Sequence, residues 1–194
     1  MRVGAVQCKS TAGDIITNIE RHLQFIQIAA KNNVDLLFFP ELSIIGYEPR
    51  LAKPLAMTLS DLVLDSLKEQ SNRHDITIGV GLPLAVEEQV QIGMVWFIPN
   101  EPSLSYAKQQ LHDDELPYFV SGEEQLILRS GKYTIAPAIC YESLQPNHAD
   151  HAVAMGANVY LASVAKSDGG IAKAMRHYPE IALKHNMFVI MATV

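Results

Sequence analysis

Three polar residues stand directly after apolar segments of the chain, and together their types could perform nucleophilic catalysis. Glu41 follows Leu-Leu-Phe-Phe-Pro, Lys108 follows Tyr-Ala, and Cys140 follows Tyr-Thr-Ile-Ala-Pro-Ala-Ile. A thiol attacks a carbonyl carbon when a base takes its proton and when cations or N–H donors stabilise the resulting oxyanion. A carboxylate that loses solvent beside an apolar segment has a raised pKa, which suits a general base. The three residues therefore predict a hydrolytic site centred on Cys140.

Each of these residues also has an ordinary structural interpretation. A lone cysteine is commonly a small buried hydrophobe, Glu41 could cap a helix or loop, and Lys108 could be a solvated surface residue. Their joint occurrence at strand ends favours the catalytic interpretation. A Cys–His acyl transferase is a rival, but no histidine stands at a strand end; the histidines in polar or helical stretches are His112, His148, His151, His177 and His185. The second cysteine, Cys8, lies on the first apolar strand and is interpreted as structural.

The hydrophobic pattern predicts an α/β domain in which these strand ends meet. Short apolar runs predict strands, and apolar residues at helical spacing predict helices. The first strand, helix and strand fall within forty residues, which implies neighbouring parallel strands. The expected strands are 2–7, 34–39, 76–82, 91–98, 104–108, 125–129, 132–139, 158–163 and 187–193, and the expected helices are 15–31, 59–72, 147–155 and 171–185, with one helical turn at 113–116. Side chains at the carboxyl ends of such strands face the crevice in which open α/β sheets bind ligands.

Composition argues against several classes of partner. The chain has 194 residues, 15 Lys and Arg against 21 Asp and Glu, and a net charge of −6. This balance gives no electrostatic reason to expect nucleic acid or an anionic membrane as partner. The N-terminus does not read as a signal peptide and no run is long enough for a membrane helix, so we expect a cytoplasmic protein. Two cysteines and scattered histidines predict neither a disulfide framework nor a metal site.

Three motifs carry a family resemblance. Phe39-Pro40-Glu41-Leu42-Ser43, Tyr106-Ala107-Lys108-Gln109-Gln110-Leu111 and Ala138-Ile139-Cys140-Tyr141-Glu142 stand in the order and approximate spacing of the nitrilase, or carbon–nitrogen hydrolase, superfamily. The resemblance runs from Val3 to Thr193 and includes Gly156-Ala157-Asn158. The motifs are specific in combination, whereas each alone would be weak. Small residues at 162–165 depart from the aromatic that many members carry there, so the substrate class is not carried over at that point.

The resemblance implies a role for each matching residue. Glu41 would be the general base, Cys140 the nucleophile and Lys108 the cation that stabilises the oxyanion. Glu115 would be a second carboxylate that orients Lys108 and the substrate or water, although it could instead belong to a solvated acidic loop. The backbone N–H of Tyr141 would complete the oxyanion hole, and Glu142 would support the site from behind or else be an exposed carboxylate.

The resemblance also implies a fold and an activity. We expect one domain over residues 1–194, a four-layer α-β-β-α sandwich of the nitrilase type that is C-terminally incomplete in this chain. The expected activity is cleavage of the carbon–nitrogen bond of a small linear amide through a cysteine thioester, with no cofactor. Nitrile or N-carbamoyl hydrolysis and a catalytically silent binding or assembly module are the alternatives. The expected partners are a small-molecule amide and further copies of the chain, in a homodimer or higher homo-oligomer.

Overall fold

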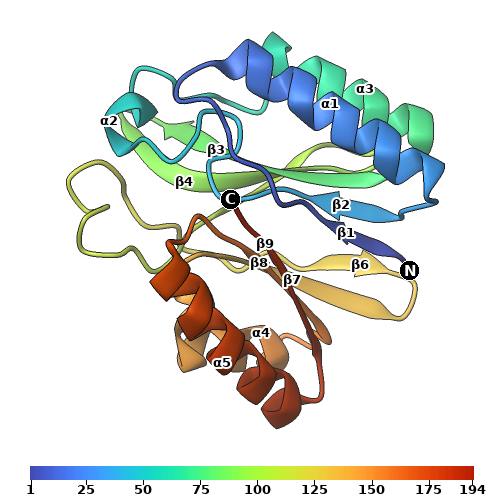
Figure 1. The fold of residues 1–194 in the computed structure, drawn as a ribbon, viewed down its shortest axis with the longest axis vertical. Coiled ribbons are helices and arrows are strands. Elements are labelled where there is room, and N and C mark those ends of the chain that lie inside the picture. The colour runs from blue at the N-terminus through green and yellow to red at the C-terminus, as the bar shows by residue number, and fades with distance from the viewer.

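The structure is a computed structural model that describes residues 1–194, and it consists of two sheets stacked face to face with helices outside each (Figure 1). One sheet has the strand order β1-β2-β3-β4-β5 and the other β6-β7-β8-β9. Helices α1 (Ile15–Lys31) and α3 (Asp65–His74) cover the first sheet, and α4 (Pro146–Ala154) and α5 (Asp168–His185) cover the second. The predicted α-β-β-α sandwich is therefore confirmed.

The first sheet is mixed. Strands β1 (Val3–Ala5), β2 (Leu36–Phe38) and β3 (Thr77–Val86) are parallel, as the β-α-β reading of the first forty residues predicts. Strands β4 (Gln89–Phe97) and β5 (Leu104–Ala107) then continue antiparallel. Because β2 and β3 are parallel, the carboxyl end of β2 lies beside β3. Glu41 follows this end of β2.

The second sheet brings the ends of β7 and β8 together. Strand β6 (Leu128–Ser130) pairs antiparallel with β7 (Tyr133–Ile139), and β8 (Val159–Ser163) and β9 (Phe188–Ala192) follow in parallel. Pro137 is tolerated inside β7 because β6 pairing stops at Ile135, so its missing N–H falls where no strand neighbour needs it. Asn186, predicted as a helix stop, ends α5 in the left-handed conformation with φ of 49°.

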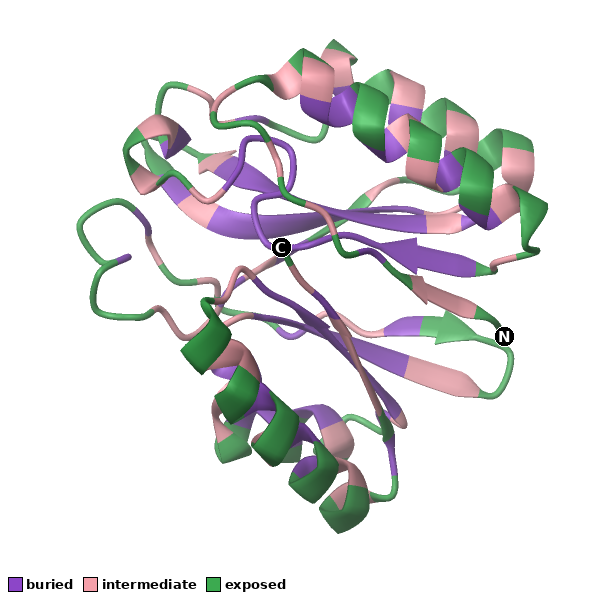
Figure 2. Ribbon diagram, viewed as in Figure 1, coloured by how far each residue is buried: buried purple, intermediate pink, exposed green.

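The main core lies between the two sheets and beneath α1 and α3. Buried residues fill the inner strands β2, β3, β4, β7 and β8, whereas the outer helix faces are exposed (Figure 2). The edge strands β1 and β9 are only partly buried. A hydrogen bond from Ser163 Oγ to the Phe39 carbonyl oxygen, at 2.8 Å, joins the two sheets near the ends of β8 and β2. None of the helices combines the length and apolarity that crossing a membrane requires.

Several element boundaries differ from the sequence prediction; β3 runs on to Val86, β6 begins at Leu128, and α5 begins at Asp168. The helix expected over 59–72 is a short 3₁₀ segment, η1 (Leu62–Leu64), followed by α3. Leu62 is 83% exposed, so the apolar spacing that extended the predicted helix does not reflect a buried face. The segment at 113–116 forms turns rather than a helical turn, and the short helix α2 (Pro49–Ala52) was not predicted.

Candidate active site

Glu41, Lys108 and Cys140 each follow a strand, and the chain reverses sharply at two of these points. Cys140 follows β7 with φ of +47°, and Leu42, directly after Glu41, has φ of +51°. A residue with a Cβ in this left-handed region carries roughly 1–2 kcal/mol of backbone strain. The Cys140 amide donates to the Ser163 carbonyl at 3.0 Å, and the Ser143 amide donates to the Cys140 carbonyl at 3.2 Å. These bonds hold the turn that leads into the 3₁₀ segment η2 (Glu142–Leu144).

Lys108 lies at the centre of a buried charge cluster. Its Nζ donates to Glu41 Oε1 at 2.8 Å and to Glu115 Oε1 at 2.6 Å, and the Lys108 side chain is fully buried. Glu115 also accepts from the Tyr47 hydroxyl at 2.9 Å and from the His112 amide at 2.8 Å. Glu115 is only 1% exposed, so it does not belong to a solvated acidic loop.

The backbone of Ala165 joins Cys140 to this cluster. The Ala165 amide donates to Glu41 Oε2 at 3.2 Å, and the Cys140 thiol donates to the Ala165 carbonyl at a sulfur–oxygen distance of 3.7 Å. The structure therefore brings Glu41, Lys108, Glu115 and Cys140 to one place. The Cys140 side chain contacts the Ala165 carbonyl and Lys166, a hydrogen bond with the Cys140 thiol also favours the charged form of Glu41, and no histidine is among these partners.

Burial and the mutual fields of these groups set their protonation. Burial, aided by the Glu41 carboxylate, raises the pKa of the Cys140 thiol to about 12, against the opposing effect of Lys108 and Lys166. The free thiol is thus neutral near pH 7 and needs a base in order to react. Burial also raises the pKa of Glu41. The Lys108 ammonium lowers this pKa, and the Glu115 carboxylate raises it further. Burial lowers the pKa of Lys108, but the neighbouring anionic groups outweigh it and leave that pKa above its usual value, so Lys108 stays charged.

Glu142 fastens the Cys140 turn to the chain that follows Lys108. Its Oε1 accepts from the Ile139 amide and the Tyr106 hydroxyl, both at 2.7 Å, and its Oε2 accepts from the Gln109 amide at 2.7 Å. The side chain is fully buried, which excludes the alternative of an exposed carboxylate. Burial raises the pKa of Glu142 to about 7, although these donated hydrogen bonds favour its charged form. Glu142 does not reach Cys140 or Lys108 side-chain atoms by any hydrogen bond, so its contribution is to position both segments.

A cavity of about 350 Å³ opens directly onto the cluster. Cys140, Glu115 and Tyr141 are among the residues that line it, and the Tyr141 ring is in edge contact with His112 at 5.2 Å between centroids. No protein acceptor takes the Tyr141 amide hydrogen, which leaves that donor free at the start of η2. The cavity thus offers a small molecule access to the thiol and to one free N–H.

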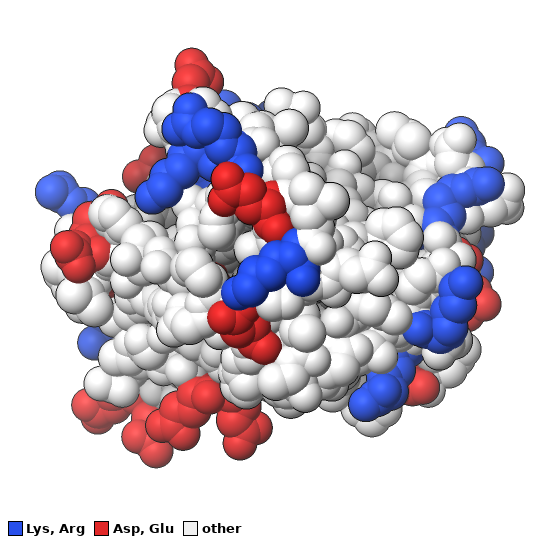
Figure 3. Space-filling view, turned by 90° about the horizontal axis from the view of Figure 1, so that it is seen from below, with Lys and Arg blue, Asp and Glu red and all other residues white.

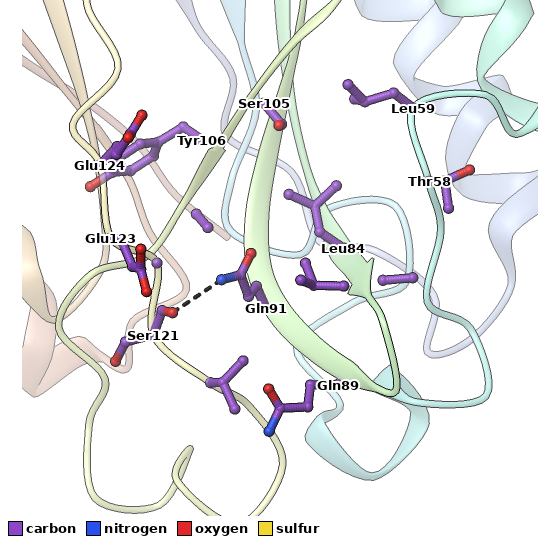
Figure 4. A pocket seen from close by; sticks show the side chains of 15 residues that line it. Thr58, Leu59, Leu84, Gln89, Gln91, Ser105, Tyr106, Ser121, Glu123 and Glu124 are labelled. Carbon is purple, nitrogen blue, oxygen red and sulfur yellow. Dashed lines mark hydrogen bonds between the residues drawn. The ribbon is translucent and has the colours of Figure 1, made fainter.

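A larger hollow, of about 720 Å³, lies beside β4 and β5 and is a poorer candidate (Figure 4). Its walls carry Glu123, Glu124 and glutamine side chains, and Gln91 Nε2 donates to the Ser121 carbonyl at 3.0 Å. It holds neither cysteine nor any of the predicted site residues. No group of three or more His, Cys, Asp or Glu side chains in the chain is arranged to hold a metal ion.

Two residues of the site were not predicted from the sequence. Lys166 follows β8, and its Nζ lies 3.5 Å from Cys140 Sγ and 3.4 Å from the Cys140 carbonyl oxygen. Its place just after a strand is the signal that identified the other three, and it could have been found in the same way. Tyr47 lies in a loop with no strand-end signal, and only its contact with Glu115 reveals it.

Fold and site together define a class of protein: a four-layer α/β sandwich with a buried Glu–Lys–Glu cluster beside a cysteine at a strained turn. The chain belongs to the carbon–nitrogen hydrolase family, whose sequence profile matches residues 2–194. This confirms the resemblance that the three motifs indicate.

Solved structures agree with the fold. An amidase from Nesterenkonia sp. superposes with a TM-score of 0.90 at 24% identity, covering 100% of this chain and 78% of that one. One structure of that amidase records Michael addition of acrylamide at its active-site cysteine. A CN-hydrolase superfamily protein from Xanthomonas campestris gives a TM-score of 0.89 at 18% identity, covering all of this chain and 75% of that one.

Curated relatives include much longer proteins. A glutamine-dependent NAD(+) synthetase from Thermotoga maritima is 27% identical over 171 residues, which are 83% of this chain and 29% of that protein. The corresponding protein from Aquifex aeolicus is 26% identical over 163 residues, 77% of this chain and 27% of its own length. The chain thus spans less than a third of the curated relatives it matches.

Proposed function

We propose that this chain is an amidase that cleaves the carbon–nitrogen bond of a small linear amide through a thioester on Cys140 and releases ammonia or an amine. The observation that carries the proposal is the buried Lys108 ammonium, held at 2.8 Å by Glu41 and at 2.6 Å by Glu115 beside the thiol. Burying three charged groups lowers the stability of a fold. Their use in activating a thiol nucleophile would explain why this protein buries them. Family membership and the relatives' names, an amidase and glutamine-dependent synthetases, are consistent with an amide substrate.

In the first half-reaction Glu41 acts as base and then as acid. Its carboxylate takes the Cys140 proton while Sγ bonds to the amide carbon, and the carbonyl π electrons move onto oxygen. Lys108 and the Tyr141 N–H stabilise that oxyanion. The oxyanion collapses, the C–N bond breaks, and Glu41 returns its proton to the leaving nitrogen, which leaves a thioester.

In the second half-reaction water replaces the amine. Glu41 takes a proton from water as its oxygen attacks the thioester carbon, and the same two donors stabilise the second oxyanion. Collapse breaks the C–S bond, and the proton on Glu41 restores the thiol, so the acid product leaves and the site is regenerated. Glu115 positions the Lys108 ammonium throughout, because it accepts a second hydrogen bond from Nζ, at 2.6 Å.

The partners we propose are a small-molecule amide and further copies of the chain. On the face shown in Figure 3 Lys and Arg are interspersed with Asp and Glu, without one continuous basic patch of the kind that nucleic acid requires. Exposed apolar side chains on α5, among them Met175 and Leu183, support contact with a second subunit through this helix. Sedimentation measurements would test the homodimer, and a monomer at micromolar concentration would argue against it.

Trapping the thioester tests the proposal. The protein is incubated with a panel of linear amides, quenched in acid and digested, and its peptides are weighed by mass spectrometry. The expected result is an acyl adduct on the peptide that contains Cys140 and none on the peptide that contains Cys8. Amide turnover by the wild type would contradict the proposal if neither the wild type nor a Glu41→Gln variant carried an adduct on Cys140. Ligand binding without adduct or turnover would favour the silent binding module, and adducts only from nitriles or N-carbamoyl compounds would identify those substrate classes instead.

A further inference from the structure

The turn that carries Glu41 has a strained backbone, which other parts of the fold must hold in place. Leu42, the next residue, has a positive φ of +51°. A residue with a Cβ keeps that conformation only where its surroundings fix it. Lys108 and the Ala165 amide hold the Glu41 carboxylate, and these contacts act on the side chain. The backbone on either side of Glu41 therefore depends on further groups.

Helix α1 supplies a buried histidine that contacts the chain on both sides of Glu41. The His22 ring stacks on the ring of Phe39, two residues before the base, at 3.9 Å between centroids and 25° between planes. Its Nε2 lies 3.0 Å from the Oγ of Ser43, two residues after the base. His22 and Ser43 are each only 1% exposed, so their hydrogen bond is shielded from solvent.

The hydrogen bonds of the His22 ring have a defined direction. Its Nδ1 lies 2.7 Å from the Asn18 carbonyl oxygen, which can only accept, so Nδ1 carries the ring hydrogen. Burial lowers the pKa of His22 to about 4, so the ring is neutral near pH 7 and Nε2 is an acceptor. Ser43 Oγ therefore donates to Nε2, and it accepts from the Gly81 amide at 3.3 Å. One ring thus links α1, the turn that carries Glu41 and β3.

Asn18, one turn earlier on α1, holds the next part of the same segment. Its Nδ2 donates to the Ile44 carbonyl at 3.0 Å and to the Thr11 carbonyl at 2.8 Å, and its Oδ1 accepts from the Thr11 amide at 2.8 Å. These bonds fix α1 against the chain around residue 44, so His22 meets Ser43 from a firm support. Neither Asn18 nor His22 lines the 350 Å³ cavity, so neither contacts a molecule bound there.

We propose that His22 is a positioning residue that sets where the Glu41 carboxylate lies relative to the Cys140 thiol, through the Phe39 stack and the Ser43 hydrogen bond. This inference rests on the proposed amidase function, in which Glu41 is the base, and adds a residue of α1 to it. A general base works only within hydrogen-bond reach of the proton it takes. A displacement of about 1 Å can lower the rate roughly 100-fold. Movement of this turn would displace the base and leave the cavity walls in place.

Three substitutions separate the ring from its hydrogen bond. His22→Phe keeps an aromatic ring against Phe39 but removes the acceptor, Ser43→Ala removes the donor, and His22→Gln removes the ring but keeps an acceptor. We expect His22→Phe and Ser43→Ala each to lower kcat for amide hydrolysis roughly 10- to 100-fold, with KM unchanged. His22→Gln should retain more of kcat than His22→Phe. The double variant of His22→Phe and Ser43→Ala should lose no more than either single variant, because both remove one hydrogen bond.

Ile26→Val is the matched control for a general loss of stability. Ile26 lies one turn further along α1 and is fully buried, but its apolar side chain cannot hold Ser43. This variant should melt at a lower temperature and keep the kcat of the wild type. The inference would be overturned if kcat per folded molecule fell no further in His22→Phe and Ser43→Ala than in Ile26→Val. A raised KM with unchanged kcat would also overturn it, because the substitutions would then act on substrate binding.

Hydrogen exchange separates this inference from the proposed function, because it requires no turnover. Mass spectrometry follows amide exchange in the peptide that spans residues 39–46. Faster exchange of this peptide in His22→Phe than in Ile26→Val would support the inference even if the wild type hydrolysed no amide. Equal exchange in the two variants would overturn it. Amide hydrolysis with the same kcat in His22→Phe as in the wild type would uphold the proposed function and refute the inference.

Discussion

Replacing Glu115 by glutamine removes one of the two carboxylates that hold Lys108. The new amide keeps the size of the side chain but cannot match all of its donors. In the wild type Lys108 Nζ and the Tyr47 hydroxyl donate to one Glu115 oxygen, and the His112 amide donates to the other. The NH₂ group of the glutamine must replace one of these two oxygens, and it would then face donors. Loss of a hydrogen bond to a charged group costs about 1.5–3 kcal/mol. If that loss falls on the oxyanion-stabilising lysine, kcat/KM drops roughly 10- to 100-fold.

The same substitution should shift the acid limb of the pH–rate profile. Glu41 Oε1 and Glu115 Oε1 bind the same Nζ at 2.8 and 2.6 Å, so these two oxygens lie at most 5.4 Å apart. Two like charges at that separation repel by roughly 3 kcal/mol at an effective dielectric constant of about 20, equivalent to about two pKa units. The Glu115 carboxylate raises the pKa of Glu41, so its removal lowers that pKa. Because Glu41 must be ionised to take the thiol proton, the acid limb moves to lower pH.

The assay is kcat/KM for amide hydrolysis against pH, across the acid and neutral range. We expect the acid limb of Glu115→Gln to lie about one to two pH units below that of the wild type, in line with the ~2-unit estimate from Coulomb's law. Asp113→Asn is the matched control, because Asp113 is exposed in the same loop and should move the limb little. An acid limb that stays in place or moves to higher pH in Glu115→Gln would refute the coupling between the two carboxylates.

Two further predictions concern residues that position the site. Glu142→Gln sets an NH₂ group against buried N–H or hydroxyl donors and should lower the free energy of unfolding by about 2–4 kcal/mol in urea titrations. The pKa of Glu142 is about 7 in the folded protein and near 4.5 in the unfolded chain, so its contribution to stability is complete below pH 4.5 and is lost as the pH rises through about 7. The substitution should therefore cost more free energy of unfolding at pH 5 than at pH 8. A cost that is the same at both pH values would contradict this. Gly81→Ala should cost about 3 kcal/mol and impair turnover, because its Cβ would lie 2.5 Å from the Pro40 oxygen and the Leu42 nitrogen, which flank the base. Gly131→Ala, where φ is +56° but the space is open, should cost about 1 kcal/mol with activity intact, and equal effects at the two glycines would rule out the packing argument.

The site could be predicted where topology decides it. Strands β2 and β5 run in the same direction within the first sheet, so Glu41 and Lys108, which follow them, lie at one edge of it. Cys140 follows β7 of the second sheet, and the face-to-face stacking of the two sheets brings it to Glu41 through the Ala165 backbone. Glu115 lies in an irregular loop whose course no periodicity predicts, and only the family resemblance pointed to it. Lys166 carries the same strand-end signal, because it follows β8, but its contact with Cys140 Sγ is seen only in the structure.

The fold could be predicted where hydrophobic periodicity reflects burial. The pattern gives α1 at the predicted residues 15–31, because its apolar stripe packs on the first sheet. The helix expected from residue 59 begins at Asp65 instead, since Leu59 and Leu62 are exposed and their apolar spacing is incidental. The α2 helix has only four residues, too few for any periodicity to show.

Ammonia release by Cys140→Ala tests the central claim most directly. Cys8→Ala serves as the matched variant, because Cys8 lies shortly after the first strand, packs against the main core, and its amide donates to the Thr193 carbonyl rather than to a site residue. Loss of the nucleophile should reduce kcat at least roughly 1,000-fold with the fold intact by circular dichroism, while Cys8→Ala retains wild-type turnover. Wild-type turnover in Cys140→Ala, or its loss in Cys8→Ala alone, would contradict the assignment of Cys140 as the nucleophile.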